Sequence, residues 1–205
     1  MPRGSEELTD QRKKEIIRAC GKLYKSRGFR DITIKDISVE TTFSRPSIYN
    51  YFETKEEIFL ALLTEEYAEW TRDLLKIAKG KEPVTGDALA EQIAGTLKKR
   101  TTLLKISAMN IYEIEENSRL ERLVEFKKAF RDSMVAFTRC LELCPTSRGE
   151  ARKEEIRYAF FPFMNGVYPY AYPTEKQRQA MDQAEVPYEV HSVYELTRQF
   201  LRQIL

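Results

Sequence analysis

Residues 33–59 read TIKDISVETTFSRPSIYNYFETKEEIF, and the predicted fold follows from this stretch. Thr33 stands three residues before Asp36, which is the spacing of a capping box at the start of a short helix. The polar, β-branched run VETTFS then predicts a tight connection, because it is poor in helix-forming residues. Ser44 can cap another short helix, with Pro46 in its first turn, where a missing N–H does no harm.

This second short helix separates apolar from polar side chains. At 100° per residue, Ile48 and Phe52 point to one side, whereas Ser47 and Tyr49 point to the other. A longer helix, predicted over residues 10–27, precedes the two short ones. These are the proportions of a helix-turn-helix, whose second short helix enters the major groove of DNA with its N-terminal residues leading.

The residue types on the polar side suit contact with DNA. Arg45 can donate two hydrogen bonds to guanine, and Tyr49 can place its ring against a thymine methyl group. Thr33 and Lys55, at the starts of the flanking helices, can hold the phosphate backbone together with the N–H groups there. The alternative is that the aromatic residues only pack a helical core. We expect such packing for Phe52 and expect Tyr49 to face the groove.

Over residues 10–60, the sequence resembles the DNA-binding motif of the tetracycline-repressor (TetR) family of bacterial transcriptional regulators. The threonine that opens the second helix, DIS after it, FS at the turn, IYNYF in the recognition helix and TKEEIF carry the resemblance. The chain departs from the family at Thr41-Thr42-Phe43, often Ala-Gly-Val, and at Pro46, often glycine. By resemblance, the DNA-facing residues are Thr33, Ser44, Arg45, Pro46, Ser47, Tyr49, Asn50, Tyr51 and Lys55.

The rest of the chain has an apolar period near 3.6 and no strand-like alternation, so the predicted fold class is all-α. A three-helix helix-turn-helix DNA-binding domain is expected over residues 1–56, and a second helical domain over residues 57–205. The resemblance implies that the protein is a homodimeric repressor, and that the C-terminal domain dimerises and binds a small-molecule effector that releases the DNA. A helix over about residues 54–79 links the two domains, and residues 80–86 form the clearest break. Further helices are predicted at residues 86–108, 119–143, 150–168, 174–184 and 188–205.

The most distinctive text of the C-terminal half is YAFFPFMNGVYPYAYP, residues 158–173. Pro162 would kink a helix and Pro169 would loosen or end it, and an irregular aromatic helix can line a concave pocket. Plain core packing is the alternative for each aromatic residue. The acidic run at residues 112–116 favours either a cationic effector or a solvated bend. The predicted effector-pocket residues are Tyr112, Phe126, Phe130, Phe161, Met164 and Tyr168.

The last predicted helix carries a wide apolar stripe for a terminal helix. By resemblance, this helix and the one around residues 152–168 form a two-fold four-helix bundle. Such a dimer would bring two recognition helices to successive major grooves and predicts a pseudo-palindromic operator. Packing of the stripe within its own chain is the alternative. The predicted interface residues are Val190, Val193, Tyr194, Thr197, Leu201 and Ile204.

Charge and hydropathy narrow the class of protein. The formal net charge is +2, but residues 1–56 hold 12 basic and 9 acidic side chains, a balance that permits a nucleic-acid partner. Nothing approaches an 18-residue apolar run and the N-terminus lacks an apolar signal region, so we expect neither a membrane span nor secretion. A cytoplasmic bacterial protein is the simplest interpretation.

Catalytic and metal-binding chemistry has little support in the sequence. Cys140 and Cys144 would share a helical face, which suits a metal or a redox pair, but plain buried thiols are favoured because no second ligand pair accompanies them. His191 is the one histidine of the chain. We therefore expect no cofactor, no metal and no catalytic residue. Two alternatives to a repressor stay open: an activator with the same DNA-binding module, and a helical enzyme with a vestigial one.

Overall fold

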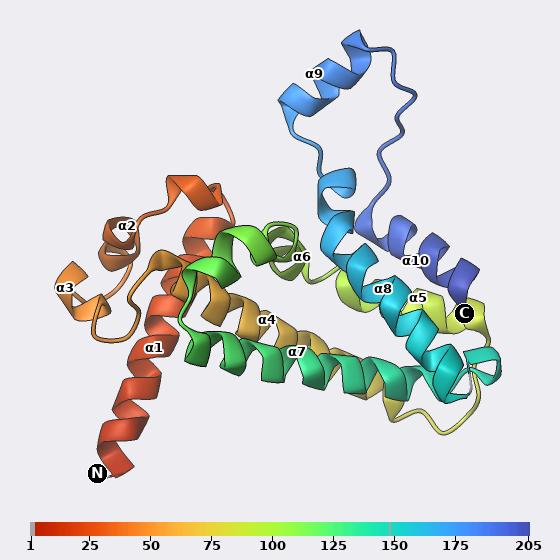
Figure 1. Cartoon of the computed structure of the whole chain (residues 1–205), viewed down its shortest axis with the longest axis horizontal. Coiled ribbons are helices and arrows are strands. Elements are labelled where there is room, and N and C mark those ends of the chain that lie inside the picture. Colours follow the sequence, from red (N-terminus) through yellow and green to blue (C-terminus); the bar gives the residue numbers. More distant parts are fainter. Residues whose placement is uncertain (1–2, 148) are drawn as a thin grey trace. The chain divides into compact units, whose positions relative to one another are not determined.

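Helices make up all the regular structure in residues 3–147 and 149–205, which the computed structural model of the chain describes (Figure 1). The predicted all-α class is confirmed. The helices are α1 (Arg3–Tyr24), α2 (Ile34–Val39), α3 (Arg45–Ile48), α4 (Lys55–Ala78), α5 (Gly86–Leu97), α6 (Thr101–Ser107), α7 (Leu120–Leu141), α8 (Glu150–Ala171), α9 (Glu175–Gln183) and α10 (Val193–Ile204). Short helical turns occur at Phe29–Asp31, Asn110–Ile114, Glu115–Asn117 and Pro145–Ser147. None of the helices in this part of the chain is long and apolar enough to cross a membrane.

The chain forms two compact units, and neither is continuous in sequence. The first comprises Met1–Glu66 and Met109–Lys128, and the second comprises Tyr67–Ala108 and Ala129–Leu205. The boundary expected between residues 56 and 57 does not coincide with these units. The reason is that α4 and α7 each run from one unit into the other, while the segment before α7 packs with the N-terminal helices.

The first unit has the helix-turn-helix that the sequence predicts. The Thr33 hydroxyl accepts from the Asp36 backbone N–H at 3.2 Å, and the Asp36 carboxylate accepts from the Thr33 N–H at 2.9 Å, so the predicted capping box is confirmed. Tyr24 and Phe29 both meet the ring of Phe59 edge to face, with centroids 5.0 and 4.9 Å apart. This aromatic contact joins α1, the turn before α2, and α4 in one core.

The recognition helix is shorter than its sequence pattern suggests. α3 ends at Ile48, and the chain continues to Phe52 as a turn. The Ser44 side chain does not cap the backbone; its hydroxyl instead lies 2.8 Å from that of Ser47. Ile48 and Phe52 are nevertheless both buried, as predicted, with 0% and 2% of their surface exposed.

The second unit is built around aromatic side chains from α4, α7 and α8. Phe137 stacks on Phe160 with ring centroids 4.5 Å apart and an interplanar angle of 4°. Phe161 lies edge-on to Trp70 and to Phe130, at centroid distances of 6.0 and 5.2 Å. Such pairs stabilise a core beyond the apolar area that they bury.

Two predicted helices have different bounds in the structure. The helix expected over residues 86–108 is broken between α5 and α6, where Arg100 leaves helical geometry and its Nε donates to the Asp73 carboxylate at 3.2 Å. The helix α8 runs through Pro162 and Pro169 to Ala171, so neither proline ends it. Pro162 is exposed, so its ring lies on the solvent side of the helix.

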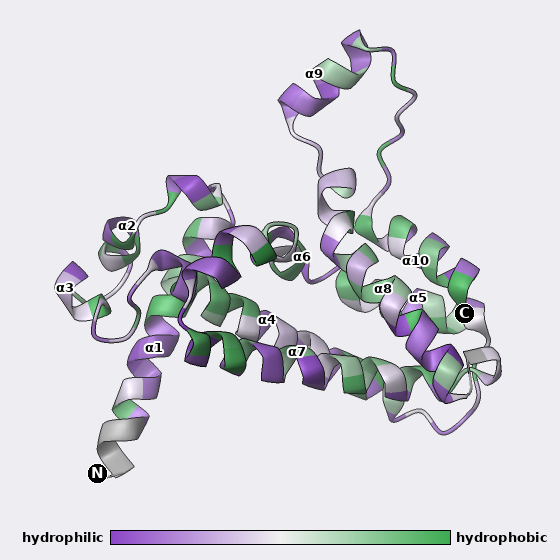
Figure 2. Ribbon diagram, in the orientation of Figure 1, coloured by the Kyte–Doolittle hydropathy of each residue, from purple (hydrophilic) through white to green (hydrophobic). Residues whose placement is uncertain are grey.

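The apolar stripe of α10 packs inside its own chain, against α5 and α8. Hydrophobic and hydrophilic residues alternate along this helix (Figure 2). Val193, Thr197 and Leu201, which were predicted to meet a second copy, have 2%, 0% and 0% of their surface exposed. These three residues are corrected to intramolecular core, because an amphipathic pattern does not tell which surface covers it. Phe200 completes the contact by stacking on Phe163 at 4.2 Å.

A pair of neighbouring positions on α7 tests the aromatic core. We expect Phe137→Ala to lower the free energy of unfolding by about 3–5 kcal/mol, because it removes a fully buried ring and leaves a cavity. Val135→Ala, two residues away and 47% exposed, should change it by less than about 1 kcal/mol. Urea denaturation followed by circular dichroism measures both, and equal effects would contradict the assignment of the core.

Candidate nucleic-acid interface

The polar side of α3 is open to solvent. Arg45, Pro46 and Asn50 are exposed, Tyr49 has 43% of its surface exposed, and Ser47 is half-buried. The burial of the opposite side fixes this orientation, because Ile48 and Phe52 are held in the core. These five side chains are thereby presented together from six consecutive positions of the chain, residues 45–50.

Arg45 and Tyr49 lie against each other on this surface. The Arg45 Nη2 donates to the Tyr49 hydroxyl at 3.3 Å, and its guanidinium carbon is 5.9 Å from the ring centroid. A cation–π contact at an exposed site contributes only about 0.5–1 kcal/mol. The guanidinium can therefore exchange this contact for a base edge or a phosphate at little cost.

Tyr51 has a different environment from Tyr49. Its hydroxyl accepts a hydrogen bond from Arg12 Nη1 at 3.1 Å, and its ring lies 6.5 Å from that of Phe43. Tyr51 thus links α1 to the end of the recognition segment, and its hydroxyl holds the Arg12 guanidinium beside that segment. Arg12 was not among the residues predicted to face DNA, although it belongs to a basic run, RKK, in α1 that is typical of phosphate contacts.

The flanking positions differ in how free they are. Thr33 is exposed at the N-terminus of α2, and Ser44 is exposed ahead of α3. The ammonium of Lys55 instead donates to the carbonyls of Phe29 and Ile32 at 3.0 and 3.3 Å and lies 4.1 Å from the Phe29 ring centroid. Lys55 therefore holds the start of α4 to the turn before α2, and a phosphate would have to compete with two carbonyls for it.

A hollow of about 570 Å³ lies between these elements in the first unit. Thr33 and Lys35 line it from the start of α2, Arg45 and Tyr49 from α3 and the turn that follows it, and Lys55 from the start of α4. Backbone N–H groups at helix N-termini attract anions, and the basic side chains add to this attraction. Glu53 and Glu56 also line the hollow, and their carboxylates repel an anion. The affinity of the hollow for a phosphate therefore depends on which of these side chains the phosphate contacts.

The predicted effector-pocket residues fall in both units. Phe130, Phe161 and Met164 lie in or beside the aromatic core of the second unit, and Tyr168 lies 4.9 Å from the ring of Tyr172. In the first unit, Phe126 is buried whereas Tyr112 is 85% exposed, so Tyr112 lines no enclosed site in this structure. An open hollow of about 480 Å³ at the end of α8 contains none of the predicted residues; it is lined by Pro169, Tyr170, Pro173, Gln177, Ala180, Met181 and Tyr188.

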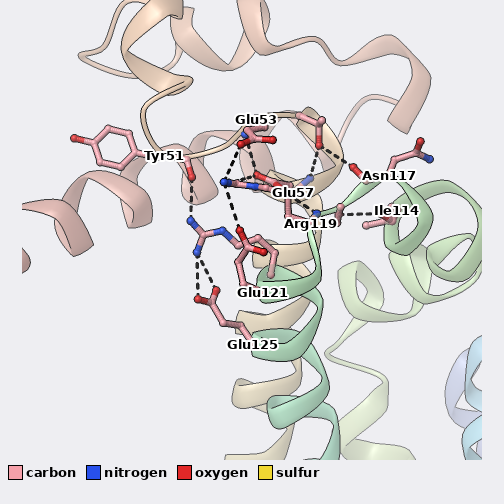
Figure 3. A network of polar contacts seen from close by, with 11 residues as sticks. Tyr51, Glu53, Glu57, Ile114, Asn117, Arg119, Glu121 and Glu125 are labelled. Atoms are coloured by element: carbon pink, nitrogen blue, oxygen red, sulfur yellow. Dashed lines mark hydrogen bonds and ion pairs between the residues drawn. The ribbon is translucent and has the colours of Figure 1, made fainter.

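A polar network in the first unit joins the start of α4 to Arg119, immediately before α7, and to the first turns of α7 (Figure 3). The carboxylate of Glu57, only 1% exposed, accepts from Arg119 Nε at 2.6 Å, from Arg119 Nη2 at 2.9 Å and from the Glu53 backbone N–H at 2.8 Å. Burial raises the pKa of Glu57, but these hydrogen bonds outweigh it and hold that pKa below its ordinary value. Glu57 is thus ionised and fully engaged.

Glu57 also lies three residues after Thr54, which is the spacing of a capping box. Its backbone N–H does donate to the Thr54 hydroxyl at 3.2 Å. The carboxylate, however, turns to Glu53 and Arg119 in place of the Thr54 N–H. No local pattern pointed to Arg119, which lies 62 residues further along the chain.

The cysteines have the character of buried thiols. Burial raises the pKa of Cys20 and of Cys140 to about 12, and the Cys140 thiol lies 3.2 Å from the carbonyl of Leu74. In the described part of the chain, no group of three histidine, cysteine or acidic side chains is arranged to hold a metal ion.

Two models of one protein family match the chain. The model described as "Bacterial regulatory proteins, tetR family" matches residues 16–62, and "Tetracyclin repressor-like, C-terminal domain" matches residues 64–205. The junction between the matches lies within α4. Together they extend the resemblance seen around the helix-turn-helix to the end of the chain.

Two curated relatives from Bacillus subtilis (strain 168) are described as uncharacterized HTH-type transcriptional regulators. The chain is 36% identical to YfiR over 78 residues, which are 38% of this chain and 38% of that protein. It is 36% identical to YdgC over 53 residues, 26% of this chain and 27% of that protein. The matches therefore span less than half the length of either relative.

Solved structures show the same fold over nearly the whole chain. A TetR/AcrR-family regulator from Thermobifida fusca has a TM-score of 0.59 at 21% identity, covering 95% of this chain and 96% of that one. A TetR-family regulator from Mesorhizobium loti reaches 0.61 at 15% identity, covering 96% of each chain. The fatty acid degradation regulator FadR from Bacillus halodurans reaches 0.57 at 11% identity, covering 93% and 96%.

The lowered pKa of Glu57 gives a pH dependence with a definite sign. Because the folded state binds this proton more weakly than the unfolded chain, the carboxylate stabilises the fold above its ordinary pKa of 4.5, and this contribution is lost as pH falls through the lower folded value. We expect Glu57→Gln to lower the free energy of unfolding by about 1–3 kcal/mol at pH 7. The difference from the unmodified protein should shrink below pH 4.5 in urea denaturation. A difference that is constant with pH would contradict the role of the charge.

Proposed function

The chain belongs to the TetR family of bacterial transcriptional regulators, and from this premise we propose that it is a homodimeric, cytoplasmic repressor. In this proposal α3 reads a pseudo-palindromic operator, and a small-molecule effector bound in the C-terminal domain releases the DNA. The observation that carries the proposal is the exposed polar side of α3 over a buried apolar side. It is what a helix needs in order to enter the major groove while it stays attached to its domain.

The proposed base contacts come from Arg45, Ser47, Tyr49 and Asn50. The Arg45 guanidinium supplies the planar pair of donors that matches the O6 and N7 acceptors of guanine, a contact that discriminates by about 1–3 kcal/mol. Tyr49 supplies a ring edge for a thymine methyl group or a hydroxyl for a phosphate. Pro46 faces the same groove and adds apolar surface without a donor.

The proposed phosphate contacts flank these residues. Thr33 and Ser44 are exposed beside helix N-termini, where backbone N–H groups and hydroxyls can hold the DNA backbone. Tyr51 contributes less through its own hydroxyl than by fixing Arg12 next to the groove. Lys55 supports the start of α4 and joins the phosphate contacts only if it leaves its carbonyl partners.

For the dimer we propose the exposed face of α8 in place of the buried stripe of α10. Tyr158 and Tyr170 are 72% and 65% exposed, and Pro162, Gly166 and Pro169 lie between them on the same side. A helix face with this much apolar surface is typical of a protein–protein contact. Tyr194 and Ile204 of α10 are half-buried and Val190 is exposed, so they can join its margin.

Two alternatives to a repressor are a transcriptional activator and an enzyme. An activator would use the same DNA contacts and raise transcription from the operator. An enzyme with a vestigial helix-turn-helix would bind no duplex specifically, and it is disfavoured because the family is one of DNA-binding regulators. Reporter expression from the bound promoter, with and without the protein, separates repressor from activator.

Substitutions on α3 test the DNA contacts. The operator is first identified as the genomic fragment that the purified protein retains. We then expect Arg45→Ala and Tyr49→Ala each to lower operator affinity by about tenfold or more at fixed salt, because each removes a base contact. Fluorescence anisotropy measures this, with Arg139→Ala, an exposed arginine of the second unit, as the control. Full operator affinity in both α3 variants would refute the assignment of α3 as the reading helix.

The dimer face is tested by charge. The double substitution Tyr158→Glu and Tyr170→Glu should convert the dimer to monomer at micromolar concentration, because it buries two carboxylates in an apolar contact. Sedimentation velocity reports the change. Tyr112→Glu, at an 85% exposed position of the first unit, should leave the dimer intact. A double variant that sediments like the unmodified dimer would place the interface elsewhere.

A further inference from the structure

The recognition helix cannot fix its own orientation. With four residues, α3 is far below the length at which helical hydrogen bonds stabilise a segment, so its direction depends on what holds its ends. Ile48 and Phe52 anchor its buried side, and the hydroxyl of Tyr51 is held by Arg12. A further anchor reaches the backbone of Tyr51 from α7.

Arg122 of α7 makes this contact. Its Nη2 donates to the carbonyl oxygen of Tyr51 at 3.2 Å, and its guanidinium carbon lies 5.8 Å from the centroid of the Phe52 ring. The Nη1 donates to Glu125 at 3.0 Å, so Glu125 keeps the guanidinium turned toward the recognition segment. The side chain is 17% exposed, so most of it is buried beside the recognition segment.

Three residues earlier and immediately before α7, Arg119 anchors the other side of the connection. It pairs with the carboxylate of Glu57, near the start of α4, and its Nη1 also lies 2.9 Å from Glu53 (Figure 3). The two arginines therefore hold residues on either side of the short connection between α3 and α4. Asn117 adds a third tie, because its carbonyl accepts from the Thr54 hydroxyl at 3.2 Å.

These contacts join the two family regions through side chains. Arg119 and Arg122 fall in the part matched by the C-terminal model, whereas Tyr51 and Glu57 fall in the part matched by the N-terminal one. All four lie in the first compact unit. These contacts therefore lie within the same compact unit as α3.

We propose that Arg122 is a positioning residue for operator recognition: by holding the Tyr51 carbonyl and the Phe52 ring, it sets the angle at which α3 presents Arg45 and Tyr49. This inference rests on the proposed function. Base contacts require side chains to be placed within about half an ångström, whereas non-specific phosphate binding tolerates a tilt. Loss of Arg122 therefore lowers specific affinity and leaves non-specific affinity nearly unchanged.

The experiment compares Arg122→Met and Arg122→Lys with Arg131→Met, which removes an exposed arginine of the same helix. Anisotropy is measured on the operator duplex and on a scrambled duplex of equal length, over a series of salt concentrations. For Arg122→Met we expect operator affinity to fall by about tenfold or more, with less than a twofold change on the scrambled duplex and an unchanged salt slope. Arg122→Lys, which keeps one donor, should restore part of the loss, and Arg131→Met should behave like the unmodified protein.

The outcomes separate this inference from the function on which it rests. If the unmodified protein binds both duplexes equally, the proposed function fails. If it prefers the operator and Arg122→Met keeps the same preference, the positioning role is overturned. Equal losses on both duplexes with a shallower salt slope would mean that Arg122 contacts phosphate directly, which also overturns it. Should Arg122→Met not fold, Arg122→Lys decides, because an unchanged operator preference in that variant contradicts the proposal.

Discussion

The burial of Ile48 and Phe52 is the constraint on which the DNA-binding surface depends. Together they fix one side of a segment that is too short to be a stable helix by itself. Once that side is fixed, the exposure of Arg45 and Tyr49 follows from the geometry of the backbone. The surface is thus produced by packing beneath it, and the polar residues on it are free to serve recognition.

The features that the sequence predicted well are those set by neighbours within four residues. The capping box of Thr33 with Asp36 is present, because it is complete within one turn. The burial of Ile48 is of the same kind, since helical periodicity alone separates it from its polar neighbours. A local pattern is sufficient wherever the partner lies on the same turn.

The features that the sequence did not predict have partners far along the chain. Lys55 had the position of a phosphate ligand, but it binds the carbonyl of Phe29, 26 residues earlier. Val193 and Leu201 had the pattern of an interface, yet α5 and α8 of the same chain cover them. In each case the sequence pattern indicated which kind of partner the side chain requires, an acceptor or an apolar surface. Which group of the molecule supplies that partner depends on the fold.

Arg119, immediately before α7, and Arg122, within it, differ in how readily their contacts can change. The Glu57 carboxylate is 1% exposed, so water cannot replace Arg119, and an unpaired charge there would be strongly disfavoured. Arg122 holds a neutral carbonyl and already shares its guanidinium with Glu125, which is 59% exposed, so its contact can loosen without stranding a charge.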